Sequence, residues 1–360
     1  MKAVLLYNTI VFIADLVFLL VVARKRKSWE VISVMTACML TAAVSGVLVG
    51  TTMFDALALY SYAVFLHGLI CFIGLSAISW RSSRRTGTMF LMLAILLPVV
   101  ALDSFFVEPQ WLEVSRVEIH SDKIERPIKI VVIADLQTDE IGAYEERVFE
   151  RTMAEKPDLI LLAGDYFQAY PETRRKLAAK VRSFLHQIHF SAPLGIYAVP
   201  GNIDRGEWPD AFRDLPVTTI LKTRTIATRY LDLTALIDRD SWNTELKVQG
   251  TKRFHITMGH RPDFALGEID SDLLIAGHTH GGQVQIPFWG PVMILSRVPR
   301  SWASGVTKLD RNRTLVVSRG VGMERGGAPE VRFLCRPELV VLTIVPTGKQ
   351  TDGLNVLNVP

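Results

Sequence analysis

Four long apolar stretches lie within the first 106 residues, and they restrict the fold more than any other feature of the sequence. They cover about residues 4–23, 31–53, 57–80 and 87–106. Each is close to the roughly 20 residues that a helix needs to cross a bilayer. They also explain a mean hydropathy of +0.26, which is too apolar for an ordinary soluble protein. The sequence therefore predicts four transmembrane helices.

Basic residues gather in the two short loops on one side of these helices. They are Arg24, Lys25, Arg26 and Lys27 after the first stretch, and Arg81, Arg84 and Arg85 after the third. Short loops rich in Lys and Arg stay in the cytoplasm, so both ends of the helical region are expected outside. The first stretch has its positive charges after it, unlike a cleaved signal peptide. We predict a multi-pass protein of the cell (inner) membrane with an extracytoplasmic C-terminal region.

Polar residues and composition narrow the alternatives further. Asp15 and His67 lie inside apolar stretches and are expected to form hydrogen bonds between helices, although a polar site in the bundle is an alternative. The formal net charge is +4 without a long basic tract, so no nucleic-acid partner is expected. The three cysteines form neither a disulfide framework nor a CxxC metal motif. The sequence does not indicate the oligomeric state.

Strands and helices alternate after the membrane region. Residues 107–127 are interpreted as a connector with a strand at about 112–119. Further strands are predicted at 128–134, 159–163 and 195–199, with helices at 144–155 and 174–188. This order indicates an α/β sheet with its site at the strand ends.

The predicted elements become shorter in the second half of this region, after Asn202. Residues 217–221 and 229–233 are predicted as strands of a second sheet, and 238–250 as a surface loop. Further strands are expected at 254–258, 273–276, 284–286, 314–318, 331–333 and 339–344. We predict a domain at 128–346 and a disordered tail at 347–360, which is polar and lacks periodicity.

Residues that can bind metals follow five of the predicted strands. They are Asp135, Asp165, Asn202, His260, and His278 with His280. Each alone is typical of a turn or a helix cap. Together, carboxylate, amide and imidazole groups can hold two divalent cations, which activate a water and neutralise a phosphoryl group.

These positions lie in motifs that resemble the calcineurin-like metallophosphoesterase superfamily over about residues 112–346. The motifs are Asp135-Leu136-Gln137, Gly164-Asp165, Gly201-Asn202-Ile203-Asp204, Gly259-His260 and Gly277-His278-Thr279-His280. A second group is similar to the bacterial membrane-associated branch, which includes UDP-diacylglucosamine pyrophosphohydrolase-type enzymes. These motifs are Gly281-Gly282-Gln283, Ser318-Arg319-Gly320 and Arg336-Pro337-Glu338-Leu339.

The resemblance implies that an α/β two-sheet sandwich with metals at its strand ends follows the N-terminal four-helix transmembrane region. It implies that Asp165 bridges two divalent ions and that a hydroxide between them is the nucleophile. The implied ligands are Asp135, Gln137 and His280 for the first metal, and Asn202, His260 and His278 for the second. Asp165, His278 and Asn202 are the implied catalytic residues. Mn2+ is the first expectation, with Fe or Zn as alternatives.

Three positions depart from the family pattern. Gln137 replaces a histidine ligand, Gln168 replaces an aspartate, and Ile203 replaces a histidine that could donate a proton. An amide oxygen is a weaker ligand than imidazole for transition metals. No substrate-binding residue is assigned, although Arg205, Thr138, Asp139 and Arg261 are polar candidates.

Two functions remain open. One is a phosphoesterase acting on a phosphodiester, phosphomonoester or pyrophosphate in a small molecule or a lipid. The other is a degenerate, non-catalytic phosphate- or metal-binding module of a membrane sensor or scaffold; a transporter with an accessory domain is a third reading. We expect an enzyme, because a degenerate site would also be expected to lose the other ligands. An outward-facing site could not reach UDP-diacylglucosamine, which is made in the cytoplasm.

Overall fold

The computed structural model describes residues 2–24, 27–347 and 356–357. The chain divides into a helical unit, Met1–Val107 with Arg325–Glu330, and a sheet unit, Glu108–Glu324 with Val331–Pro360. Each unit is described here by itself.

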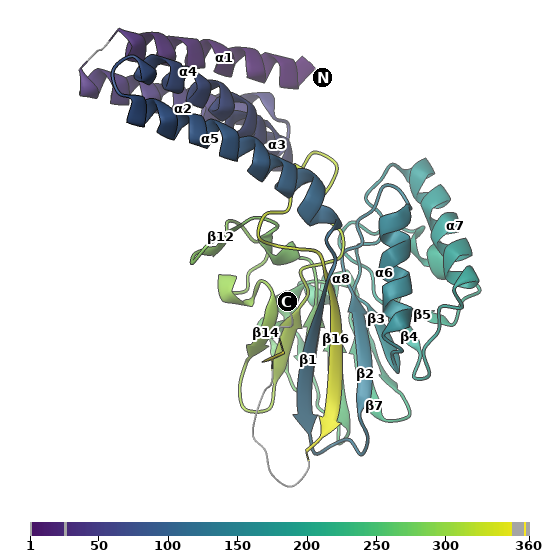
Figure 1. The fold of residues 1–360 in the computed structure, drawn as a ribbon. Helices are drawn as coiled ribbons and strands as arrows, with labels where there is room; N and C mark the ends of the chain where they lie inside the picture. The colour runs from purple at the N-terminus through teal and green to yellow at the C-terminus, as the bar shows by residue number, and fades with distance from the viewer. Residues whose placement is uncertain (1, 25–26, 348–355, 358–360) are drawn as a thin grey trace. The chain divides into compact units, whose positions relative to one another are not determined.

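The helical unit is a bundle of apolar helices (Figure 1). Its elements are α1 (Lys2–Ala23), α2 (Ser28–Val49), α3 (Met53–Tyr62), the π-helix η1 (Ala63–His67), α4 (Gly68–Trp80), α5 (Arg84–Leu102) and the π-helix η2 (Asp103–Val107). Within the described residues, four helical segments are long and apolar enough to cross a membrane: Lys2–Ala23, Ser28–Val49, Met53–Trp80 and Arg84–Gln110. These segments coincide with the four stretches predicted from the sequence.

A buried polar group links α1 to η1. His67 Nδ1 lies 2.6 Å from Oδ2 of Asp15, and His67 Nε2 lies 2.9 Å from Oδ1 of Asn8. Side chains of this kind stabilise helix packing where water is excluded. The predicted hydrogen bonding of Asp15 and His67 between helices is confirmed.

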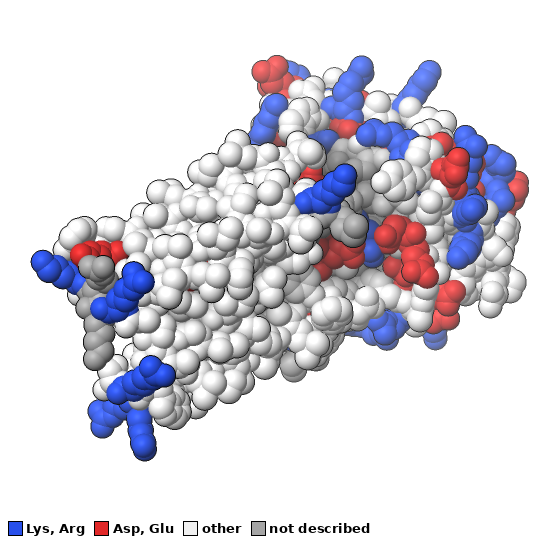
Figure 2. All heavy atoms as spheres, turned by 90° about the horizontal axis from the view of Figure 1, so that it is seen from above, with Lys and Arg blue, Asp and Glu red and all other residues white. Residues whose placement is uncertain are grey.

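The α1–α2 and α4–α5 turns lie at the same end of the bundle (Figure 1). Lys and Arg side chains gather at that end, and the helix surface beyond it shows few charges (Figure 2). This separation of charge is the feature on which the predicted orientation depends.

Two large sheets, counted over the described residues, form the sheet unit. The first has the strand order β17 (Val356–Leu357), β1 (Glu113–Ser121), β16 (Glu338–Pro346), β2 (Ile128–Ile133), β3 (Leu159–Leu162), β4 (Ile196–Ala198) and β5 (Val217–Thr219). The second has the order β14 (Gly305–Lys308), β15 (Thr314–Val317), β11 (Leu273–Ala276), β9 (Phe254–Met258), β7 (Leu231–Ala235) and β6 (Arg224–Ala227). Parallel and antiparallel pairs occur in both sheets.

Short elements complete the sheet unit. The paired strands are β8 (Lys247–Val248) with β10 (Glu268–Ile269), and β12 (Gln285–Ile286) with β13 (Gly290–Pro291). The short helices are η3 (Glu108–Gln110), η4 (Trp208–Phe212), α8 (Asp238–Ser241), η5 (Pro262–Leu266), η6 (His280–Gly282) and η7 (Arg300–Trp302).

The main hydrophobic core lies between the two large sheets. Ile130 and Leu161 of the first sheet share one buried cluster with Ile256 and Ile275 of the second. Neighbouring residues on the first sheet, such as Ile160, point the other way, as alternation along a strand requires. They pack against α6 (Ala143–Ala154) and α7 (Pro171–Gln187), which cover the outer face of that sheet (Figure 1). The α/β organisation follows the sequence prediction.

Three boundaries differ from those predictions. Residues 107–127 are more than a connector, because β1 pairs in parallel with β16 along its whole length. Strand β5, predicted in the second sheet, instead extends the first sheet beside β4. The loop expected at 238–250 contains α8 and β8. Pairing between distant strands decided the first two cases, and local sequence does not encode it.

Two further differences concern the end of the chain. The strand expected at 331–333 is reduced to a single bridge between Phe333 and Val284. The tail expected to be disordered at 347–360 lies mostly outside the described residues. Strand β17, within this tail, differs from that expectation because it pairs with β1. The backbone groups at the outer edge of a sheet are available for such pairing.

Candidate metal centre

The potential ligands come from loops at one edge of both large sheets. Strands β2, β3 and β4 are mutually parallel in the first sheet, and β9 and β11 are parallel in the second. The carboxyl ends of parallel strands meet at the same edge. The loops after these strands carry Asp135, Asp165, Asn202, His260, and His278 with His280.

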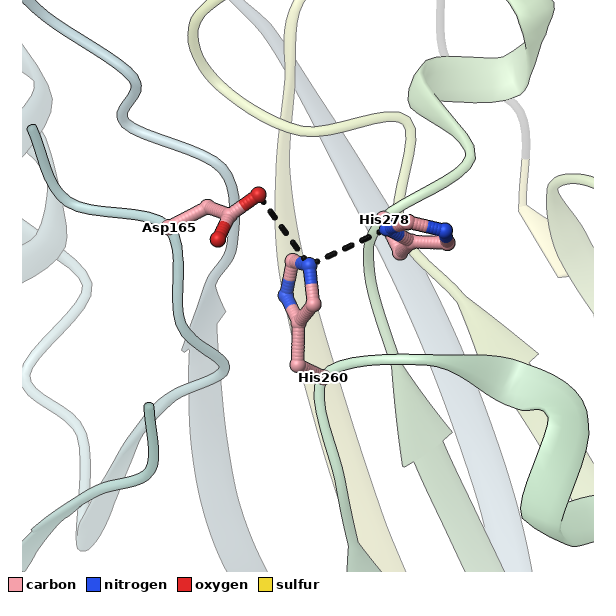
Figure 3. Close-up of side chains that lie close together, drawn as sticks. All are labelled: Asp165, His260 and His278. Atoms are coloured by element: carbon pink, nitrogen blue, oxygen red, sulfur yellow. Dashed lines mark hydrogen bonds and ion pairs between the residues drawn. The ribbon is translucent and has the colours of Figure 1, made fainter. Parts of the chain in front are cut away.

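A compact cluster forms around Nε2 of His260. This atom lies 3.1 Å from Oδ2 of Asp165, 2.9 Å from Oδ1 of Asn202 and 3.2 Å from Nδ1 of His278. The side chains of Asp165 and His278 approach His260 from separate loops (Figure 3). Ligand atoms of Asp165, His260 and His278 all lie within 4.8 Å of one another.

A second group of ligands surrounds Asp135. Its Oδ1 lies 3.7 Å from Nε2 of His280 and 4.0 Å from Nδ1 of His260. Both carboxylate oxygens of Asp135 accept the backbone N–H of His278, at 2.9 and 3.0 Å. The structure thus brings together Asp135 with His280, and Asp165 with Asn202, His260 and His278.

The backbone is strained where it presents these groups. Asp135, Asp165, His278 and His280 have φ values of 53°, 57°, 73° and 50°, in the left-handed region that L-residues rarely adopt. Such conformations cost about 1–3 kcal/mol each and cluster at functional sites. Gly201 lets two of the loops meet, because a Cβ there would collide with the Asp165 carboxylate.

The electrostatics of the cluster favour a cation. Burial tends to lower the pKa of His260, but the charges of Asp165 and Asp135 raise it to about 10. Burial raises the pKa of Asp135 to about 7 against the effect of His260. Burial, together with the positive charges of His260 and Arg261, lowers the pKa of His278 to about 3, so this ring is neutral and able to bind a metal.

The donor atoms fit divalent metal ions. Three acceptor-type atoms, from Asp165, Asn202 and His278, face one nitrogen of His260, which can carry at most one proton. The buried Nδ1 of His280 has no hydrogen-bond partner within the described part of the chain, whereas its Nε2 faces Oδ1 of Asp135 at 3.7 Å. Carboxylate, amide and imidazole ligands suit Mn2+, Fe2+ and Zn2+.

Glu324 was not predicted as a site residue from the sequence. It lies beside Gln137 and Gln168, two of the residues that depart from the family pattern. Gln137 Nε2 donates to Oε2 of Glu324 at 3.1 Å, and Gln168 Nε2 donates to Oε1 at 2.6 Å. Burial raises the pKa of Glu324. The signal available in the sequence was a single acidic residue after Ser318-Arg319-Gly320, in a segment without periodicity.

Asp204, which lies in a sequence motif but had no predicted role, holds two loops together. Its carboxylate accepts the backbone N–H groups of Asp165, Tyr166 and Gly201, at 2.8, 2.9 and 2.8 Å. The neighbouring Ile203 donates its backbone N–H to Oδ1 of Asp165 at 3.0 Å, but its side chain supplies no acid.

The polar candidates for phosphate contact are not equivalent. Arg261 Nη1 lies 3.3 Å from Nε2 of His278, and its guanidinium stacks on Trp242 at 4.3 Å. The Arg205 guanidinium reaches the backbone oxygen of Asn202 at 3.5 Å. The buried Thr138 hydroxyl bonds Glu145 instead, at 3.0 Å. Arg261 is thus a cation held directly beside the cluster.

Similarity to known proteins indicates a phosphoesterase. Residues 128–282 match the family model described as calcineurin-like phosphoesterase. The chain is 29% identical to the uncharacterized metallophosphoesterase YkuE of Bacillus subtilis, over 68% of this chain and 89% of that protein. It is 27% identical to the phosphodiesterase YaeI of Escherichia coli, over 67% of this chain and 91% of that protein. Residues 128–282 therefore resemble calcineurin-like phosphoesterases, and these similarities support a hydrolase that acts on phosphoric esters.

Proposed function

We propose that the chain is a membrane-anchored, metal-dependent enzyme that hydrolyses a phosphodiester, phosphomonoester or pyrophosphate. The observation that carries this proposal is the convergence of Asp165, Asn202 and His278 on His260. The loops that hold them come from both large sheets, so the whole fold maintains this geometry.

Each residue has a proposed role. Asp165 would bridge two divalent ions, Asp135 and His280 would hold the first, and Asn202, His260 and His278 the second. When bound, such ions lower the pKa of a water and neutralise charge on the phosphoryl group. Mn2+ is the proposed metal. Arg261, beside His278, would bind a phosphate oxygen and orient the ester.

The leaving group would receive little help from this site. Ile203 occupies the position after Asn202, and its side chain can neither donate a proton nor hydrogen-bond. Substrates with good leaving groups, such as pyrophosphates or activated diesters, are therefore favoured.

A lipid-linked substrate is our proposal for the natural substrate class. The β12–β13 hairpin exposes Phe288 and Trp289 at its turn. The following segment is joined to the metal cluster, because Leu295 O lies 2.9 Å from Nε2 of His278. Exposed aromatic side chains next to Arg300, whose guanidinium lies 5.4 Å from the Trp289 ring, are typical of surfaces that contact lipid headgroups.

The competing proposal is a non-catalytic binding module, which the isoleucine at position 203 favours. The two proposals differ in whether the protein hydrolyses phosphoesters. Purified full-length protein should contain divalent metal and hydrolyse members of a panel of phosphomonoesters, diesters and pyrophosphates. Metal without hydrolysis of any panel member would favour the binding module. The absence of both would overturn the metal-dependent proposal.

A further inference from the structure

Glu324 contacts Gln137 and Gln168, two residues that depart from the family pattern beside the proposed first metal site. We infer that its carboxylate is a ligand of the first metal and replaces the imidazole that Gln137 lacks. This inference rests on the proposed metal-dependent function and assigns an additional residue to that site.

The two glutamines hold the carboxylate from both sides. The Gln137 amide donates to one oxygen and the Gln168 amide to the other. An ionised carboxylate offers about four lone-pair positions on its two oxygens. One amide donor on each oxygen therefore leaves lone pairs free for a cation. The substitutions at positions 137 and 168 are thus explained together, because each supplies an N–H donor to Glu324.

Two separations around His280 are compatible with ligands of one cation. Oε2 of Glu324 lies 4.0 Å from Nε2 of His280, which lies 3.7 Å from Oδ1 of Asp135. Oxygen and nitrogen ligands lie about 2.0–2.2 Å from such a metal, so two ligands of one ion can be up to about 4.4 Å apart. Both of these separations fall within that limit.

The segment that carries Glu324 is firmly held. The buried guanidinium of Arg332 donates to the backbone oxygens of Arg319 and Gly322, at 2.8 and 3.0 Å. The backbone N–H of Glu324 donates to the side-chain oxygen of Gln283, which follows the loop of His280. These hydrogen bonds therefore fix the position of Glu324 beside the loop that carries His280.

The exchange of imidazole for carboxylate predicts a change in metal preference. Oxygen ligands favour harder ions such as Mn2+ and Mg2+, whereas imidazole suits Zn2+ and Cu2+. The first site should therefore prefer Mn2+ over Zn2+ more strongly than the second site, where two histidines converge.

The test is a metal titration of the purified full-length protein after chelation. Glu324→Gln keeps the size of the side chain and removes its charge. We expect Mn2+ binding at one site to weaken by more than the roughly 10–100-fold that follows loss of a group that only supports a ligand, while the other site is unchanged. Electron paramagnetic resonance of free Mn2+ and metal analysis measure this without any substrate. Glu268→Gln, an exposed glutamate paired with Lys247, is the matched control and should bind like the wild type.

A rescue variant separates ligand loss from misfolding. Adding Gln137→His to Glu324→Gln should restore tight binding at the first site and shift its preference toward Zn2+. If Glu324→Gln does not fold, Glu324→Asp replaces it in the test. This variant keeps the carboxylate on a shorter side chain and should also weaken Mn2+ binding. Unchanged Mn2+ affinity in folded Glu324→Gln would overturn the inference and leave the phosphoesterase intact. Wild-type protein that neither binds metal nor hydrolyses esters would instead overturn the proposed function.

Discussion

His260 Nε2 lies 3.1 Å from Oδ2 of Asp165, although the two residues follow strands of different sheets. The contact joins the loop after β3 to the loop after β9 at the edge of the central core. Because each sheet supplies part of the candidate metal centre, the packing of the two sheets also sets the distances between the proposed ligands.

Replacement of Asp165 tests the proposed bridge. Asp165→Asn should abolish hydrolysis and sharply reduce metal content, because a neutral amide cannot offset two divalent ions. The measurements are metal analysis and turnover of bis-p-nitrophenyl phosphate by the full-length protein. Asp310→Asn, at a surface loop, is the control. Near-normal metal content and rate in Asp165→Asn would be incompatible with a bridging carboxylate.

Position 203 should decide which leaving groups the enzyme tolerates. Ile203→His should accelerate hydrolysis of alkyl esters more than that of p-nitrophenyl esters, within the roughly 10²–10⁴-fold range of general acid catalysis. The ratio of kcat/KM for the two esters is the measurement, and Ile203→Leu is the control. Equal effects on both esters would remove the argument that the missing acid restricts the substrate.

Metal removal should lower thermal stability. The centre holds two buried carboxylates, Asp135 and Asp165, and a ligand that binds the folded state stabilises it by about 2.7 kcal/mol at 100 times its Kd. Chelation should therefore lower Tm of the protein in detergent, and Mn2+ should restore it. In Asp165→Asn the Mn2+ effect should be much smaller. An equal Mn2+ effect in both proteins would place the stabilising ion elsewhere.

Local sequence located the loops that carry the expected ligands, because each expected ligand follows an apolar run that forms a strand. Metal binding by these residues stays a prediction. Glu324 could not be found this way. Its position depends on Arg332, whose buried guanidinium binds backbone oxygens of residues 319–322. The same limit applies to β1 and β5, whose place in the first sheet is set by pairing with distant strands. Periodicity within a segment carries no information about such partners.

The β12–β13 hairpin should matter for substrates in a bilayer. Replacing Phe288 and Trp289 with serine should raise KM for a phosphoester lipid in nanodiscs several-fold, because the exposed aromatic surface is lost. Hydrolysis of soluble bis-p-nitrophenyl phosphate should not change. Leu221→Ser, an exposed apolar residue in the turn before β6, is the control. A parallel loss on both substrates would indicate a structural role for the hairpin and argue against lipid contact.

Membrane orientation limits the substrate more than any other unknown. The α1–α2 and α4–α5 turns, whose sequences are basic, lie at one end of the helical bundle (Figure 1), and short basic loops remain in the cytoplasm. We therefore expect four spans to carry Phe106 and the sheet unit to the outside. Alkaline phosphatase fused after Pro346 should be active and green fluorescent protein at the same point dark, whereas fusions after Ser82, in the α4–α5 turn, should give the reverse. Lipid phosphates or pyrophosphates of the envelope would then be the accessible substrates. A bright fluorescent fusion after Pro346 with an inactive phosphatase would place the metal centre in the cytoplasm, where nucleotide-linked lipids become accessible instead.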